Sequence, residues 1–212
     1  MKPYHFRVDE AWAKQNNELL RDSRRLRIAA LILAAIFLGA GIAARLILSS
    51  YAGSWLFFAG FAAVAIVFVI IACVTPNRAG QAQQLYDRYP LVPAIIAEVN
   101  ARDVVLLALV DASVDPAGPP VPALALRTVT ALKGHERKVG VQVPAAAVGG
   151  RRSSRAQTWD EITPMPIAWG TPDTETIAAA TAAIDRATWG KVKKLRSRLD
   201  DVKATPRNLL IL

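Results

Sequence analysis

Two long apolar runs, separated by a short polar break, constrain this chain more than any other feature of its sequence. Residues 28–48 (IAALILAAIFLGAGIAARLIL) carry one charge, Arg45, and residues 55–74 (WLFFAGFAAVAIVFVIIACV) carry none. About 20 apolar residues in a helix cross the roughly 30 Å hydrocarbon core of a bilayer. The break at residues 49–54 leaves room only for a turn. The sequence therefore predicts a transmembrane helical hairpin over residues 28–76.

Positive charges flank this hairpin outside its turn. The Lys and Arg residues nearest the two runs are Lys14, Arg21, Arg24, Arg25, Arg27 and Arg78, and the turn contains none. Because cytoplasmic flanks of membrane helices carry an excess of Lys and Arg, we predict a two-pass protein of the cytoplasmic (inner) membrane with both termini in the cytoplasm. The first run begins too late and is too long for a cleavable signal, so we expect it to remain as an anchor.

The net charge of +9 is spread evenly, with +4 over residues 1–75 and +5 over residues 76–212. A dispersed excess suits a domain held against an anionic bilayer surface, whereas nucleic-acid-binding proteins usually cluster their positive charge. We therefore expect the lipid bilayer as a partner and no nucleic acid. The single cysteine, Cys73, lies in the second run, which excludes an internal disulfide and a zinc site built from cysteines.

Residues 1–27 are predicted to form a cytosolic, amphipathic N-terminal helix. Asp9 is a suitable N-cap, and no Gly or Pro follows it before the first apolar run. Trp12, Leu19 and Leu26 recur every seven positions, which is typical of a seam against another helix or domain. We interpret the basic cluster as anchoring at lipid headgroups, with specific binding of an anionic lipid as the alternative. The cluster consists of Arg21, Arg24, Arg25 and Arg27.

Small residues recur within both apolar runs. They are Ala35, Gly39 and Ala43 in the first run and Ala59, Gly60 and Ala63 in the second. Because small residues let helices approach closely in lipid, we predict that this set forms the helix-packing and partner interface. Residues 39–44 also mimic a dinucleotide-binding fingerprint, but the preceding strand and the later carboxylate that such a site requires are missing. We expect Arg45 to reach the far headgroups or to pair with a partner subunit.

The pattern changes after a predicted linker at residues 77–93. Residues rich in Val, Ile, Leu and Thr occupy 94–99, 104–110, 123–132 and 138–143, with further extended segments at 144–150 and 161–170. Short strands separated by turns that contain Gly or Pro are typical of a small antiparallel barrel. We predict a cytosolic α+β domain in which residues 94–170 form a closed or half-closed barrel, similar to an OB or SH3 fold.

Residues 171–212 are predicted to form C-terminal helices and an apolar tail. A Thr-Pro-Asp sequence at 171–173 marks a helix start, and a second helix is expected from about residue 187 to 204. One face of the second helix is apolar and consists of Trp189, Val192, Leu195, Leu199 and Val202. The tail at 208–212 (NLLIL) is expected to pack back onto the barrel.

Three stretches of the chain resemble a known family. They are residues 15–27 (QNNELLRDSRRLR), 85–110 (LYDRYPLVPAIIAEVNARDVVLLALV) and 162–173 (ITPMPIAWGTPD). The family consists of small two-span membrane proteins from corynebacteria and their relatives and carries only an unknown-function label. The resemblance covers nearly the whole chain, includes no catalytic motif, and implies a membrane location and this architecture. Proteins of this kind are also associated with accessory subunits that co-purify with the actinobacterial cytochrome bc1–aa3 respiratory supercomplex.

The sequence offers no catalytic or cofactor-binding constellation. His5 and His135 lie far apart without a second ligand at metal-binding spacing, and neither apolar run contains a histidine for a haem. The basic loop at residues 149–155 (GGRRSSR) could hold a phosphate through its glycine amides and arginines, or it could be a solvated surface loop. Its arginines are Arg151, Arg152 and Arg155. We expect no enzyme activity, no cofactor and no metal.

The sequence thus favours a non-catalytic accessory or assembly subunit of a larger complex in the cytoplasmic membrane, with other integral membrane subunits as its partners. The resemblance implies the respiratory supercomplex as that complex. The alternative is a membrane-tethered binding module that recognises an anionic lipid, a nucleotide or a nucleic acid through its cytosolic basic surface.

Overall fold

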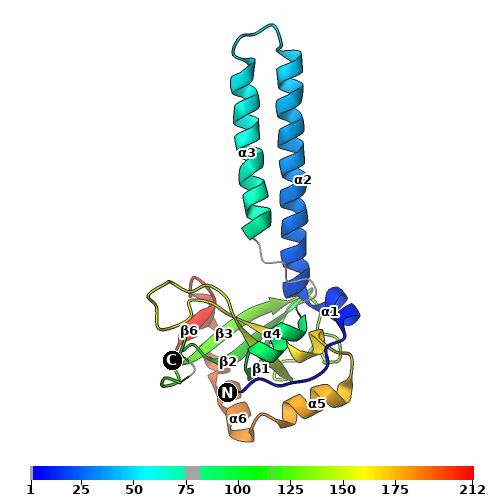
Figure 1. The fold of residues 1–212 in the computed structure, drawn as a ribbon. Coiled ribbons are helices and arrows are strands. Elements are labelled where there is room, and N and C mark those ends of the chain that lie inside the picture. The colour runs from blue at the N-terminus through cyan, green and yellow to red at the C-terminus, as the bar shows by residue number, and fades with distance from the viewer. Residues whose placement is uncertain (1, 75–81, 116) are drawn as a thin grey trace. The chain divides into compact units, whose positions relative to one another are not determined.

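The computed structural model of the protein describes residues 2–74, 82–115 and 117–212. The chain divides into two compact units (Figure 1). One unit is Leu19–Ala79, and the other combines Met1–Glu18 with Gly80–Leu212. We call the first unit the hairpin and the second the half-barrel domain. Because the half-barrel domain contains chain from both sides of the hairpin, the hairpin is an insertion in the sequence of that domain.

Two helices form the hairpin, α2 (Glu18–Ile47) and α3 (Ser54–Val74), with a turn between them. Both are long and apolar enough to cross a membrane. Only 17% and 11% of their most apolar windows is buried, whereas the core helix of a soluble protein would be mostly buried. The two apolar helices predicted at residues 28–48 and 55–74 are therefore present, and the first of them begins ten residues earlier than its apolar run.

A separate short helix, α1 (Glu10–Asn16), precedes the hairpin. Asp9 caps it, because its Oδ1 accepts a hydrogen bond from the Trp12 N–H at 2.9 Å. Asn17 is extended (ψ 104°) and separates α1 from α2, while its side-chain amide contacts Met165 Sδ at 3.3 Å. The predicted continuous helix through residue 27 is therefore wrong, because a contact with a distant strand fixes the break. The seven-residue apolar stripe that starts at Trp12 does not lie on one helix.

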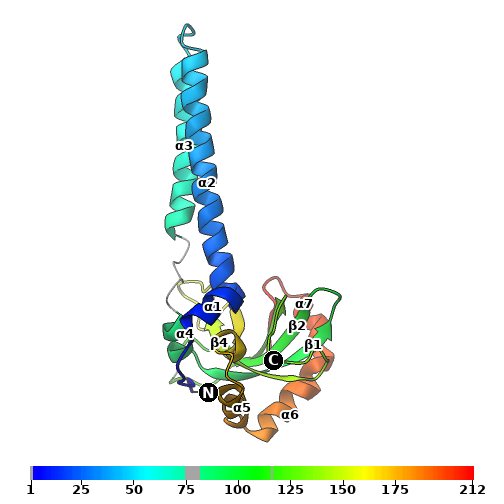
Figure 2. The ribbon, with the colours of Figure 1, turned by 90° about the vertical axis from the view of Figure 1, so that its right-hand side faces the viewer.

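Six strands form one antiparallel sheet with the order β5-β4-β1-β2-β3-β6. The strands are β1 (Leu91–Val99), β2 (Val104–Asp111), β3 (Pro122–Val129), β4 (Gln142–Gly149), β5 (Ile162–Pro166) and β6 (Leu209–Ile211). The sheet is curled (Figure 2). As a result β3 and β5, which are not neighbours in the strand order, contact each other. This half-barrel confirms the predicted half-closed antiparallel architecture.

Two predicted strand starts in this domain were wrong, because β1 begins at Leu91 rather than at residue 94 and β4 begins at Gln142 rather than at residue 138. The described part of the predicted linker contains α4 (Ala82–Arg88) and the first residues of β1, while residues 77–81 lie outside the described residues. The strand predicted at 138–143 begins only at Gln142 and continues through the segment predicted as a separate extended piece.

Paired prolines explain these errors. Pro93 of β1 faces Pro144 of β4 at a position where neither backbone nitrogen points to the other strand. Each proline also lies just beyond the ladder on its other side, since β1 pairs with β2 only from Ala94 and β4 pairs with β5 only from Ala145. Neither proline therefore removes a ladder hydrogen bond, and both can stand within strands.

Short helices follow the sheet in the sequence. They are η1 (Ile167–Trp169), α5 (Thr174–Ala182), α6 (Arg186–Lys194), η2 (Leu195–Arg198) and α7 (Leu199–Lys203). Asp173 caps α5 and Asp185 caps α6 through the backbone N–H groups of the first turn. The helix predicted at 187–204 is thus divided into three pieces, although its predicted apolar residues Trp189, Val192 and Val202 are buried. The apolar tail packs onto the sheet as β6, as predicted.

The core of the half-barrel domain lies on β1 and β2, which are buried over nearly their whole length. Central strands covered on both faces consist of continuous apolar residues, which explains the runs seen in the sequence. Trp169 of η1 is fully buried, and its Nε1–H donates to the Ala131 carbonyl at 3.0 Å. This bond connects the end of the β3 region to the start of the helical region.

Candidate functional site

Aromatic rings and one glycine pack the two hairpin helices together. Phe37 of α2 stacks on Phe68 of α3 with their ring centroids 5.6 Å apart, and it lies 6.2 Å from the ring of Phe61. A Cβ atom at Gly41 would lie 2.9 Å from Phe61 Cβ. The close approach of α2 to α3 at this point therefore requires glycine at position 41.

The small residues that the sequence singled out are not buried between the two helices, although Gly60 lines a groove beside Phe37 and Phe61. Ala35, Gly39, Ala43, Ala59, Gly60 and Ala63 are all exposed. A Cβ atom at Gly39 or Gly60 would meet no atom within 4 Å. The prediction that this set packs α2 against α3 is wrong, because the phenylalanine rings and Gly41 set the contact, and a residue two positions away faces a different direction. Their predicted role toward a partner's helix stays a prediction.

The single charge of the apolar runs lies at the turn end of the hairpin. The guanidinium carbon of Arg45 is 4.9 Å from the ring centroid of Trp55, the distance of a cation–π contact. Tryptophan is a residue that favours the membrane–water interface. The contact joins the end of α2 to the start of α3, and it is compatible with either expectation for Arg45.

The basic cluster lies in the first part of α2, before the apolar window. Arg24 and Arg25 are exposed, whereas Arg21 and Arg27 are half-buried. No break separates the cluster from the apolar residues that follow, because all lie in one helix. A helix that passes directly from basic to apolar residues suits anchoring at the headgroups, the interpretation drawn from the sequence.

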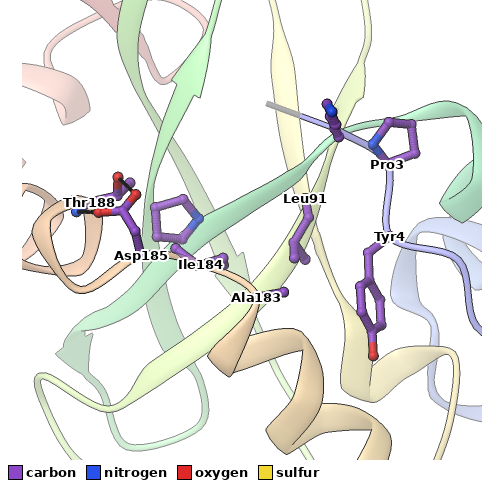
Figure 3. Close-up of a pocket in the computed structure, with 9 residues that line it drawn as sticks. Pro3, Tyr4, Leu91, Ala183, Ile184, Asp185 and Thr188 are labelled. Atoms are coloured by element: carbon purple, nitrogen blue, oxygen red, sulfur yellow. Dashed lines mark hydrogen bonds between the residues drawn. The ribbon is translucent and has the colours of Figure 1, made fainter.

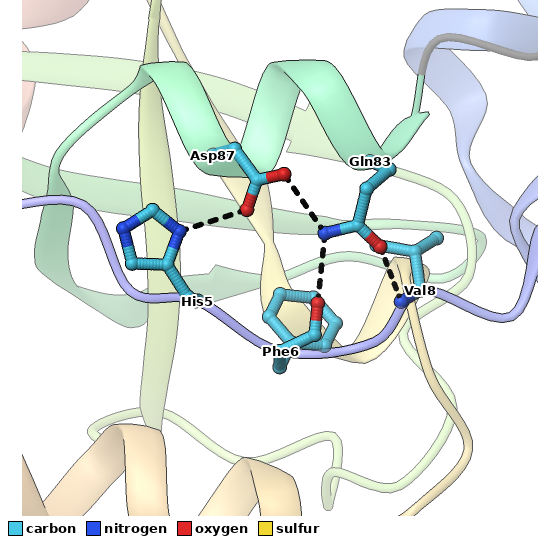
Figure 4. Close-up of polar contacts among 5 residues, drawn as sticks. All are labelled: His5, Phe6, Val8, Gln83 and Asp87. Carbon is cyan, nitrogen blue, oxygen red and sulfur yellow. Dashed lines mark hydrogen bonds and ion pairs between the residues drawn. The ribbon is translucent and has the colours of Figure 1, made fainter.

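The N-terminal segment, residues 2–18, is held against α4 by a polar network (Figure 4). The Gln83 amide donates to the Phe6 carbonyl at 2.8 Å and to Asp87 Oδ2 at 3.1 Å, and its oxygen accepts from the Val8 N–H at 2.9 Å. His5 Nδ1 lies 2.9 Å from Asp87 Oδ1. The hydrogen bond to His5, followed by that to Gln83, lowers the pKa of Asp87. Sequence analysis assigned no role to any of these residues.

An apolar contact lies beside this network. The Tyr86 hydroxyl donates to the Pro166 carbonyl at 2.7 Å, and burial raises the pKa of this phenol well above its ordinary value. The Tyr86 ring meets Phe6 edge to face, with centroids 4.9 Å apart. A Cβ atom at Gly170 would lie 2.7 Å from Tyr86 Cε2, and the Gly170 carbonyl accepts from the Asp9 N–H at 2.9 Å. The N-terminal segment is therefore packed in the domain as well as hydrogen-bonded to it.

Glu18, the last residue of this segment, binds the loop after β3. Its Oε1 accepts hydrogen bonds from the backbone N–H groups of Thr130 at 2.9 Å and Ala131 at 3.0 Å, and Glu18 itself is buried. Nearby, Trp12 Nε1–H donates to the Ala168 carbonyl at 3.0 Å. The chain that enters the hairpin is thus attached to the half-barrel domain. No local pattern could have predicted these contacts, because they join residues more than 100 positions apart.

The basic loop between β4 and β5 contains its own carboxylate. Arg151, Arg152 and Arg155 are exposed, and the Arg152 guanidinium lies 5.7 Å from the Trp159 ring centroid. Asp160 Oδ2 accepts from the Ser153 N–H at 3.1 Å and from its hydroxyl at 3.2 Å, and it lies 3.3 Å from the Arg207 guanidinium. A phosphate bound to this loop would compete with Asp160 for the amide and for the nearby charge.

A groove of about 340 Å³ lies beside the N-terminal segment (Figure 3). Its lining includes Tyr4, Leu91, Ile184 and the Asp185 carboxylate. That carboxylate accepts from the Thr188 N–H at 2.8 Å as the cap of α6, so the fold already uses its charge. Within residues 2–74, 82–115 and 117–212 there is no group of His, Cys, Asp and Glu side chains that could hold a metal ion.

These features define a half-barrel domain with two long apolar helices inserted into its sequence. The chain belongs to the family described as a protein of unknown function (DUF3239), whose model matches residues 77–200. No curated protein matches the chain. Among solved structures, a chain from Corynebacterium diphtheriae described as a "putative membrane protein" is 51% identical. That match covers 58% of this chain and 100% of the other, with a TM-score of 0.56.

Proposed function

We propose that the chain is a non-catalytic accessory or assembly subunit of a larger complex in the cytoplasmic membrane. The hairpin crosses the membrane twice, and both termini lie in the cytoplasm. The composition of the half-barrel domain supports this topology, because the domain is assembled from chain on both sides of the hairpin. Two segments of one folded unit must occupy the same compartment, and the Lys and Arg residues that flank the hairpin favour the cytoplasm.

The observation that carries the proposal is the pair of glycines that the hairpin does not use. Gly39 and Gly60 have open space where a side chain would be, although glycine in a helix costs about 1 kcal/mol relative to alanine. Gly41, in contrast, is required by the packing of α2 on α3. A partner's helix that approaches closely at Gly39 and Gly60 accounts for the small residues that the hairpin's own packing does not explain.

The specific complex that we propose is the actinobacterial cytochrome bc1–aa3 respiratory supercomplex. The support is the sequence resemblance to membrane proteins associated with its accessory subunits. Because neither apolar run contains a histidine, the electron carriers would belong to the partner subunits, and the contribution of this chain would be binding alone.

Co-purification of tagged full-length variants from a mild detergent tests the proposal. Gly39→Leu should reduce the amount of membrane complex recovered, measured as haem absorbance per mole of tagged chain, whereas Gly39→Ala should retain most of it. Gly41→Leu is the internal comparison, because it should destabilise the hairpin itself. Equal recovery with Gly39→Leu and with the unmodified chain would refute the partner surface. Recovery of a complex without haem would refute the supercomplex assignment only.

The binding module is a second candidate function. Exposed arginines beside an aromatic ring favour it, and Asp160 disfavours it, because this carboxylate accepts from the loop amide that an anion would need. Arg151→Ala combined with Arg152→Ala separates the two functions. This variant should keep its partner if the chain is an accessory subunit, and should lose binding to anionic vesicles or nucleotides if the loop is a binding site.

A further inference from the structure

The two outer strands of the sheet, β5 and β6, differ in what their free edges offer. Hydrogen bonds across the β4–β5 ladder leave the backbone groups of Ile162, Pro164 and Pro166 pointing away from β4. Two of these three residues are prolines and have no N–H, and the Pro166 carbonyl already accepts from Tyr86. The free edge of β5 is thus protected against pairing with another strand.

The free edge of β6 contains no proline, and its protection is only its length of three residues. Bonds from the Leu212 N–H to Pro122 and from the Leu126 N–H to Asn208 show that even-numbered residues of this segment face β3. The N–H and C=O groups of Leu209 and Ile211 therefore point away from the sheet. Among the residues that the structure describes, these groups have no hydrogen-bond partner.

The side chains of this segment are apolar, with Leu209 and Leu210 half-buried and the last two exposed. Ile211 and Leu212 are 46% and 44% exposed, and residues 209–212 include no charged side chain and no proline. Leu209 and Ile211 also line a groove of about 380 Å³, together with Trp159 and Arg207. Natural proteins usually block a free edge with a charge, a proline or a bulge, or keep the edge strand very short. Of these devices β6 has only the last, so its apolar edge can still pair with a short strand.

We propose that β6 pairs with β6 of a second copy of this chain, antiparallel about a two-fold axis at Leu210. In that register Leu209 lies opposite the partner subunit's Ile211, and each N–H donates to the facing C=O. The pairing satisfies both donors and both acceptors on each copy, because the outward-facing residues lie symmetrically on either side of Leu210. A contact of this kind is isologous and therefore closed.

A three-residue strand buries much less than the roughly 1,200 Å² of a stable interface. We therefore expect weak pairing between free copies and stronger pairing between copies confined to one membrane, where the effective concentration is higher. In this respect the inference rests on the membrane anchoring proposed above. Its partner and its surface differ from those of the small-residue faces on the hairpin.

Disulfide cross-linking of the full-length chain in native membranes tests the register, in a Cys73→Ala background with a mild oxidant. Directly opposed residues in a non-hydrogen-bonded pair have Cα atoms about 4.5 Å apart, within reach of a disulfide. Leu210→Cys should therefore form a disulfide-linked dimer. Leu209→Cys alone and Ile211→Cys alone should not, whereas the two variants co-expressed should form a mixed dimer. Thr163→Cys on β5 is the matched control.

Dimer yield at Leu210→Cys no higher than at Thr163→Cys would overturn the proposal, as would equal yields at all three β6 positions. Absence of the protein from membranes would instead contradict the proposed anchoring. A second variant removes the outward donor: Ile211→Pro in the Leu210→Cys chain leaves the N–H groups that face β3 in place. Cross-linking should become about tenfold slower at an unchanged melting temperature. An unchanged rate in the folded variant would also overturn the pairing.

Discussion

Removal of the Glu18 carboxylate should release the loop after β3 from the N-terminal segment. This carboxylate accepts hydrogen bonds from two backbone N–H groups, those of Thr130 and Ala131. A hydrogen bond to a charged acceptor contributes about 1.5–3 kcal/mol. Both loop residues are exposed, so water can replace the lost acceptor, and the lower end of that range applies. Glu18→Ala should thus speed hydrogen exchange about tenfold at each of the two amides.

Hydrogen exchange of the full-length chain in detergent, resolved at these two amides, measures this effect directly. Glu18→Gln retains a neutral acceptor and should produce a smaller increase, while Glu175→Ala on the exposed side of α5 should leave the two amides unchanged. Unchanged exchange at Thr130 and Ala131 in Glu18→Ala would refute the reasoning. It would mean that Glu18 does not hold this loop and that α2 can begin independently of the half-barrel domain.

Three further predictions concern the packing, the pH dependence and the topology of the chain. Gly170→Ala should lower the free energy of unfolding in urea by about 1–3 kcal/mol, because its Cβ would collide with Tyr86. Gly190→Ala, where nothing lies within 4 Å, should raise it by about 0.5–1 kcal/mol, and equal effects of the two variants would contradict the packing. The lowered pKa of Asp87 stabilises the fold above the ordinary aspartate pKa, and this stabilisation is lost as the pH falls through the lowered value. The melting temperature of Asp87→Asn should therefore depend less on pH in that range than the melting temperature of the unmodified chain. A cysteine introduced at Lys2, in a variant without the native cysteine, should resist an impermeant maleimide in intact cells, and labelling would contradict cytoplasmic termini.

Local patterns in the sequence were sufficient to predict the helices of the hairpin and most strands. Long apolar runs reflect an apolar surrounding, and short β-branched segments reflect a sheet in the core. Both patterns can be recognised within a window of about 5 to 20 residues. Pro93 and Pro144 show where such reasoning fails. A proline counts against a strand in isolation, but its cost depends on which neighbouring strand its nitrogen faces. That direction is fixed by a register between segments about 50 residues apart.

The candidate surface on the hairpin was predicted only in part, for a similar reason. Four-residue spacing of small side chains identifies a helix face along which another backbone can approach, but it does not identify the helix that approaches. Phe37, Phe61 and Phe68 place the seam at Gly41, and no spacing rule distinguishes Gly41 from Gly39. Only the mutual position of two helices decides which glycine is used internally and which stays open.

The attachment of residues 2–18 to the half-barrel domain changes how the family match should be interpreted. The family model begins at residue 77, yet the unit that folds around the curled sheet also includes chain from before the hairpin. Tyr86, inside the matched range, packs on Phe6 and Gly170, and the loop after β3 is bound by Glu18. A protein that began at residue 77 would leave those amides without Glu18 and the Tyr86 ring without Phe6. The hairpin is therefore better regarded as an insertion in one domain than as an anchor attached to its end, and a force on either apolar helix would act on the same folded unit.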